Sequence, residues 1–204
     1  MSDDVEIVEQ TRKYEGYVRV DTVRLRHRQF TGELGPEIKR DLIHVHKAVA
    51  VLPYDPVRDA VIFIRQFRVG PWGAGENPWL VESVAGVIDE GEDPETTARR
   101  ETREETGCDL SDLHFVCEYF PSPGVITEHV KLYCGIANTE NAGGTHGLAE
   151  EGEDIESIVK PWEEAWNDVQ TGMIRDAKLL LTMMWLSQKK ESLIRGSQTR
   201  KEPV

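Results

Sequence analysis

The most constraining feature of the sequence is an acidic stretch at residues 86–108, GVIDEGEDPETTARRETREETGC. A proline near its start and a glycine near its end predict a helix over residues 94–106. At roughly 100° per residue, Glu101, Glu104 and Glu105 share one arc of that helix. Like charges three and four positions apart oppose helix formation, and the helix interior has almost no apolar residue to pack. Packing alone therefore does not explain this helix.

Two interpretations of these glutamates compete. In the first, they form a solvated charged face that is stabilised by the interleaved Arg99, Arg100 and Arg103, as most runs of charge are. In the second, they hold hard divalent cations, because Mg²⁺ takes oxygen ligands and shares them with substrate phosphates. A bound metal would also convert the repulsion among the carboxylates into attraction.

The wider spacing favours the second interpretation. The stretch fits the pattern G-x5-E-x7-R-E-U-x-E-E-x-G-U, in which U is a hydrophobic residue. The fixed positions are held by Gly86, Glu92, Arg100, Glu101, Glu104, Glu105 and Gly107. Seven such matches arise by chance at roughly 10⁻⁸ per starting position. The pattern resembles the Nudix box and the chain resembles a Nudix hydrolase, although Thr102 and Cys108 stand at the two hydrophobic places.

The resemblance covers residues 15–190 approximately and indicates the ADP-ribose pyrophosphatase branch of that family. Outside the box it is carried by EGYV near the start, LPYDPVRD, RQFR, NPWLVESVAG, SPG at 122–124 and HGLAEEGEDI at 146–155. It implies an α/β fold, a Nudix α/β/α sandwich with a small N-terminal antiparallel β unit. The expected division is a β-rich unit over residues 1–46, for dimerisation and substrate contacts, and a Nudix hydrolase domain over residues 47–204.

Local patterns add detail along the chain. Residues 1–14 are charged and predict a loose lead-in, whereas residues 71–78 predict a loop and residues 79–86 a single strand. Two helices close the chain. The second is expected to begin beside Asp176, a suitable capping residue, and its polar tail from Ser187 is expected to fray.

By resemblance, the box glutamates bind Mg²⁺, with Mn²⁺ as the other suitable ion. The implied metal ligands are the backbone carbonyl of Ala85 and the side chains of Glu101, Glu104, Glu105 and Glu151. Arg100 precedes Glu104 by four residues and is expected to orient it. Glu92 and Gly86 are expected to shape the loop before the helix.

Hydrolysis of a diphosphate needs charge neutralisation on the phosphoryl oxygens and an activated water, and clustered metals help with both. A general base adds to the rate. The resemblance of HGLAEEGEDI assigns this role to Glu151, with Glu153 as the second candidate, and it counts Glu105 among the catalytic residues. The alternative for each loop glutamate is a solvated surface acid.

Substrate contacts are implied for five residues, Tyr17, Arg40, Arg68, Glu82 and Ser122. The two arginines match residues that meet the diphosphate or the terminal ribose, and a planar guanidinium suits phosphate oxygens. Tyr17 matches an aromatic residue that stacks on adenine. The alternative for each arginine is a surface ion pair. The alternative for Tyr17 is a core ring at a strand edge, and for Glu82 an ordinary strand carboxylate. The branch exchanges its N-terminal unit within a homodimer, which leaves open whose site Tyr17 and Arg40 serve.

Charge and composition exclude several classes of function. The 204-residue chain has a formal net charge of −13, which argues against partners such as nucleic acid and anionic membranes. No apolar run approaches the ~20 residues of a membrane span, and the acidic N-terminus lacks the features of a signal peptide. Three widely spaced cysteines without a CxxC pair indicate free thiols in a reducing, cytoplasmic compartment.

The expected activity is metal-dependent hydrolysis of ADP-ribose to AMP and ribose 5-phosphate. Another nucleoside diphosphate sugar, such as GDP-mannose, is the alternative substrate, because a related branch shares the architecture. A non-catalytic nucleotide-sensing module is the alternative from a different class. Such modules tend to lose box glutamates or gain a DNA-binding domain, and this sequence keeps every box acid and has no basic helix.

Overall fold

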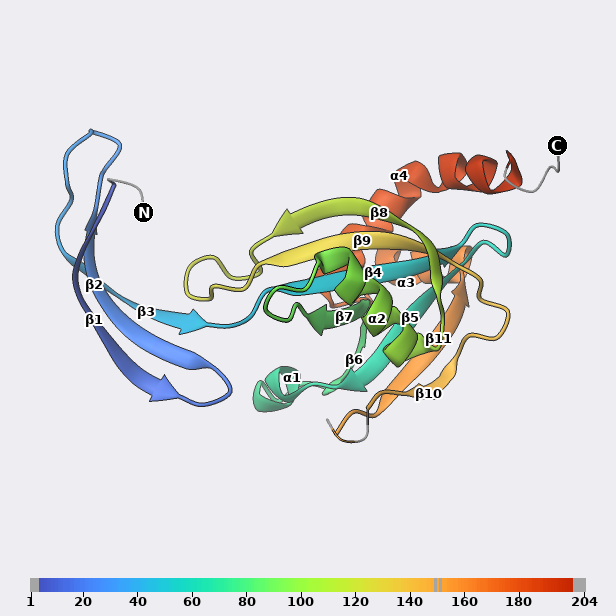
Figure 1. Cartoon of the computed structure of the whole chain (residues 1–204), viewed down its shortest axis with the longest axis horizontal. Coiled ribbons are helices and arrows are strands. Elements are labelled where there is room, and N and C mark those ends of the chain that lie inside the picture. Colours follow the sequence, from blue (N-terminus) through green and yellow to red (C-terminus); the bar gives the residue numbers. More distant parts are fainter. Residues whose placement is uncertain (1–3, 149, 151, 200–204) are drawn as a thin grey trace. The chain divides into compact units, whose positions relative to one another are not determined.

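The computed structural model describes residues 4–148, 150 and 152–199. These residues form two compact units (Figure 1). Unit 1 holds the chain through Lys47 together with Tyr119–Val130, and unit 2 holds Ala48–Glu118 and the chain from Lys131 onward. The segment Tyr119–Val130 is remote in sequence from the N-terminus, so the sequence-based division at residue 46 does not include it in the first unit.

Unit 1 is built on a three-stranded antiparallel sheet in the order β1-β2-β3. Its strands are β1 (Val5–Glu15), β2 (Arg19–His27) and β3 (Ile38–His44). The prediction of a loose lead-in is wrong for residues 5–14, because β1 pairs with β2 along its length. Nearly every β1 side chain is exposed, so the strand has no apolar alternation to reveal it. Backbone pairing and cross-strand ion pairs, such as Arg24–Glu9 at 2.8 Å, hold it instead.

Unit 2 contains an eight-stranded sheet whose main path is β10-β11-β5-β4-β9-β8. Its strands are β4 (Ala48–Asp55), β5 (Ala60–Phe67), β6 (Trp79–Glu82), β7 (Val84–Val87), β8 (Leu110–Tyr119), β9 (Val130–Ala137), β10 (Gly144–His146) and β11 (Ile155–Pro161). Its helices are α1 (Val69–Gly73), α2 (Pro94–Thr106), α3 (Trp162–Gln170) and α4 (Ala177–Thr199).

Strands β4 and β5 separate a short distance from their turn. They pair through Tyr54↔Val61 and Asp55↔Ala60, and beyond these residues β5 pairs with β6 while β4 pairs with β7. The single strand predicted over residues 79–86 is therefore two strands, interrupted at Ser83. Its backbone N–H donates to the carboxylate of Asp176 at 3.4 Å, which gives the interrupted backbone a partner. The interruption places Glu82 on β6 opposite Ile64 of β5, and Ala85 on β7 opposite Ala50 of β4.

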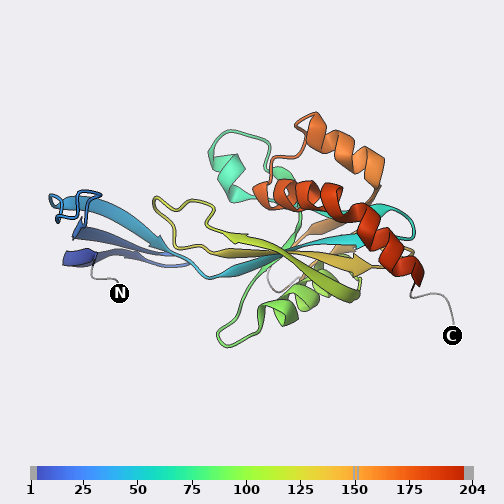
Figure 2. The ribbon, with the colours of Figure 1, turned by 90° about the horizontal axis from the view of Figure 1, so that it is seen from above.

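Helices cover both faces of this sheet (Figure 2). On one face Leu179, Met183 and Leu186 of α4 pack in a core with buried residues of β4 and β5. On the other face Ala98 of α2 packs with Val49 and other buried aliphatic residues. Because apolar side chains leave water on both faces, the sheet is the middle of three layers. The predicted α/β/α sandwich with a small N-terminal antiparallel unit is confirmed.

Two local predictions differ from the structure. Residues 71–78 were expected to be a loop, but the short helix α1 includes the first three of them. The tail from Ser187 was expected to fray, but α4 continues to Thr199, with Leu193 and Ile194 packed on the core. Lys190 adds an ion pair with Asp59 at 2.7 Å. In the described part of the chain, no helix has the length and apolar character to cross a membrane.

Candidate active site

Helix α2 begins and ends with local signals that the sequence provides. The carboxylate of Asp93 accepts hydrogen bonds from the backbone N–H groups of Glu95 and Thr96, at 3.1 and 3.2 Å. Pro94 occupies the first turn, where no intrahelical N–H bond is lost. Gly107 ends the helix with φ of 71°, a left-handed conformation that favours glycine. The helix predicted over residues 94–106 is confirmed.

The buried face of α2 is unusually polar. Thr102 is fully buried, and its hydroxyl donates to the carbonyl of Ala98 at 2.7 Å. Thr106, also buried, donates in the same way to the carbonyl of Thr102 at 2.6 Å. Each hydroxyl therefore finds a partner within its own helix, and the methyl groups are left to pack. This explains how a threonine fills a place where the box usually has an aliphatic residue.

Two box glutamates lie in a desolvated position beside β7. Glu105 is 2% exposed and its carboxylate accepts a hydrogen bond from the Ala85 N–H at 3.1 Å. Burial, with the charges of Glu101 and Glu153 added, raises the pKa of Glu105 well above its ordinary value. Burial likewise outweighs the attraction of Arg100 and raises the pKa of Glu101 to about 7, with repulsion from Glu104 and Glu153 added.

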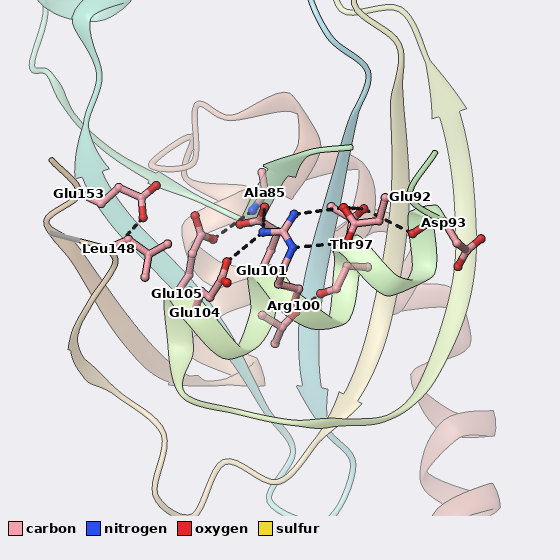
Figure 3. Close-up of polar contacts among 12 residues, drawn as sticks. Ala85, Glu92, Asp93, Thr97, Arg100, Glu101, Glu104, Glu105, Leu148 and Glu153 are labelled. Atoms are coloured by element: carbon pink, nitrogen blue, oxygen red, sulfur yellow. Dashed lines mark hydrogen bonds and ion pairs between the residues drawn. The ribbon is translucent and has the colours of Figure 1, made fainter. Parts of the chain in front are cut away.

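Arg100 links the carboxylates of three glutamates (Figure 3). Its Nη1 donates to Glu101 at 2.8 Å and to Glu104 at 3.0 Å, so the predicted contact with Glu104 is present. Its Nη2 and Nε reach the two oxygens of Glu92 at 3.3 and 3.4 Å. Glu92 in turn accepts from the hydroxyl of Thr97 at 2.8 Å. Arg100 thus joins the loop before the helix to the acidic face of the helix.

The segment between β10 and β11 brings a further glutamate to this face. Glu153 bonds to Leu148 twice, since its carboxylate accepts from the Leu148 N–H at 3.1 Å and its own N–H donates to the Leu148 carbonyl at 3.2 Å. The N–H of Gly147 approaches the carbonyl of Glu104 at 3.4 Å. Glu153 therefore stands across from the α2 glutamates (Figure 3), close enough for its charge to raise their pKa values. Glu151 lies outside the described residues.

Glu82 and Arg68 form a bidentate ion pair in unit 2. The Nε and Nη2 of Arg68 donate to the two Glu82 oxygens at 2.7 and 3.0 Å. Glu82 is 2% exposed, whereas the Arg68 side chain is 40% exposed. Burial opposes ionisation of Glu82, but Arg68 and then Lys178 outweigh it and keep its pKa below the ordinary value. The negative charge of Glu105 helps to raise the pKa of Arg68. The Arg68–Glu82 pair therefore lies within electrostatic range of the box.

Sequence reasoning did not single out Lys178. Its ammonium group lies 2.7 Å from Asp176 and 3.4 Å from Glu82. Asp176 caps α4, as expected, by accepting from the Leu179 N–H at 3.1 Å. No local pattern marks Lys178, because its role depends on β6 lying next to the start of α4, nearly a hundred residues later in the chain.

The three predicted substrate residues outside unit 2 are described within unit 1. Tyr17 lies in the turn between β1 and β2 and is 95% exposed. Arg40 is an exposed residue of β3 whose Nη1 donates to the Lys39 carbonyl at 2.8 Å. Ser122 lies in the turn after β8, where its carbonyl accepts from two backbone N–H groups. All three lie in turns or on a strand of unit 1. The side chains of Tyr17 and Arg40 are exposed and can reach a ligand.

The donors on α2 suit a hard cation. Among the described residues, no three His, Cys, Asp or Glu side chains already surround one point as ligands do, and Arg100 holds two of the glutamates. The available donors are nevertheless all oxygens, which Mg²⁺ and similar ions prefer. The raised pKa values of Glu101 and Glu105 reflect negative charge that burial leaves poorly compensated, and a divalent cation would supply that compensation. The residues therefore fit a divalent metal.

Comparison with known proteins identifies the family to which the chain belongs. A family model described as the NUDIX domain matches residues 44–181. The chain is 38% identical over 190 residues to an ADP-ribose pyrophosphatase of Escherichia coli strain K12, covering 93% of this chain and 91% of the relative. It is 36% identical over 186 residues to an ADP-ribose pyrophosphatase of Haemophilus influenzae, covering 90% and 86%.

Two further similarities concern a different substrate and the fold. A GDP-mannose pyrophosphatase of Cronobacter sakazakii is 39% identical over 151 residues, which cover 72% of this chain and 77% of the relative. A solved structure described as an ADP compounds hydrolase shares the fold, with a TM-score of 0.68 and 21% identity over 92% of this chain and 96% of that one. Together with the box residues on and before α2 and the three-layer sandwich, these matches show that the chain belongs to the Nudix family.

Proposed function

We propose that this protein is a divalent-metal-dependent hydrolase that converts ADP-ribose and water into AMP and ribose 5-phosphate. The observation that carries the proposal is that Glu153, from a distant part of the chain, stands across from the glutamates of α2 (Figure 3), where Glu105 is 2% exposed. The similarity to two ADP-ribose pyrophosphatases over most of the chain supports the choice of substrate.

The proposed metal is Mg²⁺, with Mn²⁺ as a substitute, and its ligands are the Ala85 carbonyl, Glu101, Glu105 and the auxiliary Glu104. When bound, a divalent cation offsets charge on the phosphoryl oxygens and lowers the pKa of water. Arg100 keeps the glutamates aligned through its bonds to Glu101 and Glu104. In this proposal the negative charges of the glutamates attract the cation and hold it beside α2.

Proton transfer and substrate binding fall to other residues. We assign the general base to Glu151, which accepts the proton of the attacking water, and Glu153 is the second candidate. Arg68 contacts the diphosphate while Glu82 fixes its guanidinium. The adenine stacks on Tyr17, a role that its 95% exposed ring permits. Arg40 and Ser122 are the remaining proposed substrate contacts.

We also propose that the protein acts as a homodimer with exchanged N-terminal units, in the cytoplasm. The sheet of unit 1 exposes Val5, Ile7 and Val8 at more than two fifths each, and such apolar surface is typical of an interface. The three cysteines are free thiols in the structure, which is compatible with a reducing compartment.

A second candidate substrate is GDP-mannose, because a GDP-mannose pyrophosphatase is 39% identical over 72% of the chain. The test is a comparison of kcat/KM for ADP-ribose and GDP-mannose with purified protein and Mg²⁺, with products identified by chromatography. We expect ADP-ribose to be preferred and to give AMP and ribose 5-phosphate in equal amounts. Preference for GDP-mannose would reassign the substrate, and turnover of neither compound would reject the proposed activity.

The base is tested separately. Glu151→Gln is expected to lower kcat by about 10²- to 10⁴-fold, the range typical of general-base catalysis. Glu153→Gln keeps an oxygen that can accept a hydrogen bond from the Leu148 N–H, and it is expected to lower kcat by about tenfold or less. A reversal of the two effects would move the base to Glu153.

A further inference from the structure

Four charged side chains meet at the sheet interruption around Ser83. Arg68 follows β5, Glu82 ends β6, Asp176 caps α4, and Lys178 lies in the first turn of α4. Glu82 Oε2 receives two donors, Arg68 Nη2 at 3.0 Å and Lys178 Nζ at 3.4 Å. Lys178 also donates to Asp176 at 2.7 Å. Three separate elements of unit 2 thus contribute to one hydrogen-bonded network.

The network is mostly buried and its charges balance. Glu82 is 2% exposed, Asp176 is 8% exposed, and the side chain of Lys178 is 20% exposed. Two cations therefore face two carboxylates where solvent screens them weakly. Burial opposes the charge on Lys178, yet Asp176 and Glu82 outweigh it and raise its pKa. Removing the lysine charge would leave an excess negative charge in this network.

This excess negative charge would surround Arg68, which is the cation of the network that is open to a ligand. The Arg68 side chain is 40% exposed, and its bonds to Glu82 use Nε and Nη2 but not Nη1. Glu105 already adds a negative charge to the surroundings of Arg68. An anionic diphosphate binds such an arginine less well as the surrounding negative charge grows.

We propose that Lys178 is a positioning residue for substrate binding: it shares the charge of Glu82 and Asp176, so that Arg68 is held in place and keeps its attraction for the diphosphate. This inference rests on the proposed function, because it assumes that a diphosphate binds beside Arg68. Lys178 acts through Glu82 and does not need to touch the substrate. The role explains why a lysine on α4 is directed into the sheet interruption instead of toward solvent.

The test compares Lys178 variants of the full chain with the wild-type protein, using ADP-ribose and Mg²⁺. Lys178→Met removes the charge and is expected to raise KM about tenfold while kcat changes less than about threefold, since the attraction of Arg68 for the diphosphate weakens equally in the ground state and the transition state. Lys178→Arg keeps the charge and is expected to stay within about threefold of the wild-type KM. If Lys178→Met does not fold, Lys178→Gln, which is polar and uncharged, serves the same comparison and has the same expected result.

Lys190 provides the matched control. It is also a lysine of α4 with an ion pair, to Asp59 at 2.7 Å, and it lies over the ring of Trp162 at 4.8 Å. Lys190→Met is expected to lower the melting temperature and to leave KM unchanged. A wild-type KM in the neutral Lys178 variants, or an equal rise in KM for Lys190→Met, would overturn the proposal.

The experiment separates this inference from the proposed function. Wild-type protein that does not hydrolyse ADP-ribose rejects the function before any variant is compared. Wild-type activity with an unchanged KM in the Lys178 variants rejects the inference and retains the function. Binding of α,β-methylene ADP-ribose, measured by calorimetry, is expected to weaken by the same factor as KM rises, which checks the assignment without turnover.

Discussion

Gly86 lies directly against the carboxylate of Glu101. A Cβ atom placed on Gly86 would lie 1.9 Å from the Cδ and from Oε1 of that glutamate, far inside any permitted contact. Gly86 pairs with Val49 in the β4–β7 ladder, so its backbone is not free to move away. The first glycine of the box is therefore required by close approach of a helix side chain to a strand. The position of Glu101 depends on the absence of a side chain opposite it.

Gly86→Ala is expected to displace the end of the Glu101 side chain and to weaken Mg²⁺ or Mn²⁺ binding by about tenfold or more, since a ligand leaves its position. The melting temperature should change little, because the atoms in conflict belong to a flexible side chain. Titration of Mn²⁺ followed by electron paramagnetic resonance measures the affinity. Gly70→Ala, where a Cβ meets nothing within 4 Å, is the control. Equal affinities in the two variants would contradict the role given to Gly86.

Glu105→Gln tests the buried ligand. The amide oxygen can still accept from the Ala85 N–H, which is 3.1 Å from the carboxylate, so the fold should be retained. The lost negative charge is expected to lower kcat by about 10²- to 10³-fold and to change KM by less than about threefold. Steady-state kinetics with ADP-ribose measures both. Turnover at the wild-type rate would reject Glu105 as a metal ligand.

Arg100→Met tests the guanidinium that joins three glutamates. Its loss is expected to lower the free energy of unfolding by about 1–2 kcal/mol, because Glu92, Glu101 and Glu104 then repel one another without a shared cation. Mg²⁺ should reduce the loss, since it neutralises the same carboxylates. Urea unfolding with and without Mg²⁺ measures the difference.

The control for Arg100 is Arg103, one turn away on the same helix. The side chains of Arg103 and its partner Asp109 are 71% and 74% exposed. Arg103→Met is expected to change stability by less than about 0.5 kcal/mol, as for most surface sites. A loss in Arg100→Met that does not depend on Mg²⁺ would show that the arginine acts on the helix alone.

Cys134 is expected to resist alkylation in the native protein. It is fully buried in the core beneath α4, and burial raises the pKa of its thiol to about 12. At pH 8 roughly one thiol in 10⁴ would be ionised, and the thiolate is the nucleophile. Iodoacetamide followed by mass spectrometry should label the half-buried Cys117 first. Labelling of Cys134 at the same rate would mean that this core opens readily.

The parts of the structure that the sequence predicts correctly are those with local signals. Helix α2 is marked by a capping aspartate, a proline and a glycine within one short stretch, so its limits follow from the chain itself. Asp176 as the cap of α4 is of the same kind, because a cap acts on the next three residues. The sandwich is correct as well, but it is implied by the resemblance that the box and the other quoted motifs carry, and no local pattern in the chain predicts it.

The parts that sequence reasoning misses depend on distant segments. Strand β1 has exposed side chains on both faces, and only its pairing with β2 makes it a strand. The interruption at Ser83 is stabilised by Asp176, and Lys178 finds Glu82, in each case across more than 90 residues. Arg68 was predicted as a substrate contact, but its bidentate partner Glu82 was not foreseen as such. Such contacts leave no periodic pattern, because neither partner is near the other in sequence.

The threonine hydroxyls buried on α2 have a consequence for recognising relatives. Since the Thr102 hydroxyl is satisfied by the Ala98 carbonyl at 2.7 Å, the surrounding core meets only a methyl group and a Cβ atom. That position requires a side chain of the right volume whose polar atom, if it has one, bonds within its own helix. The hydropathy of the residue is a poor measure of this requirement. A relative with threonine at this position can therefore pack this helix as well as one with an aliphatic residue of similar size.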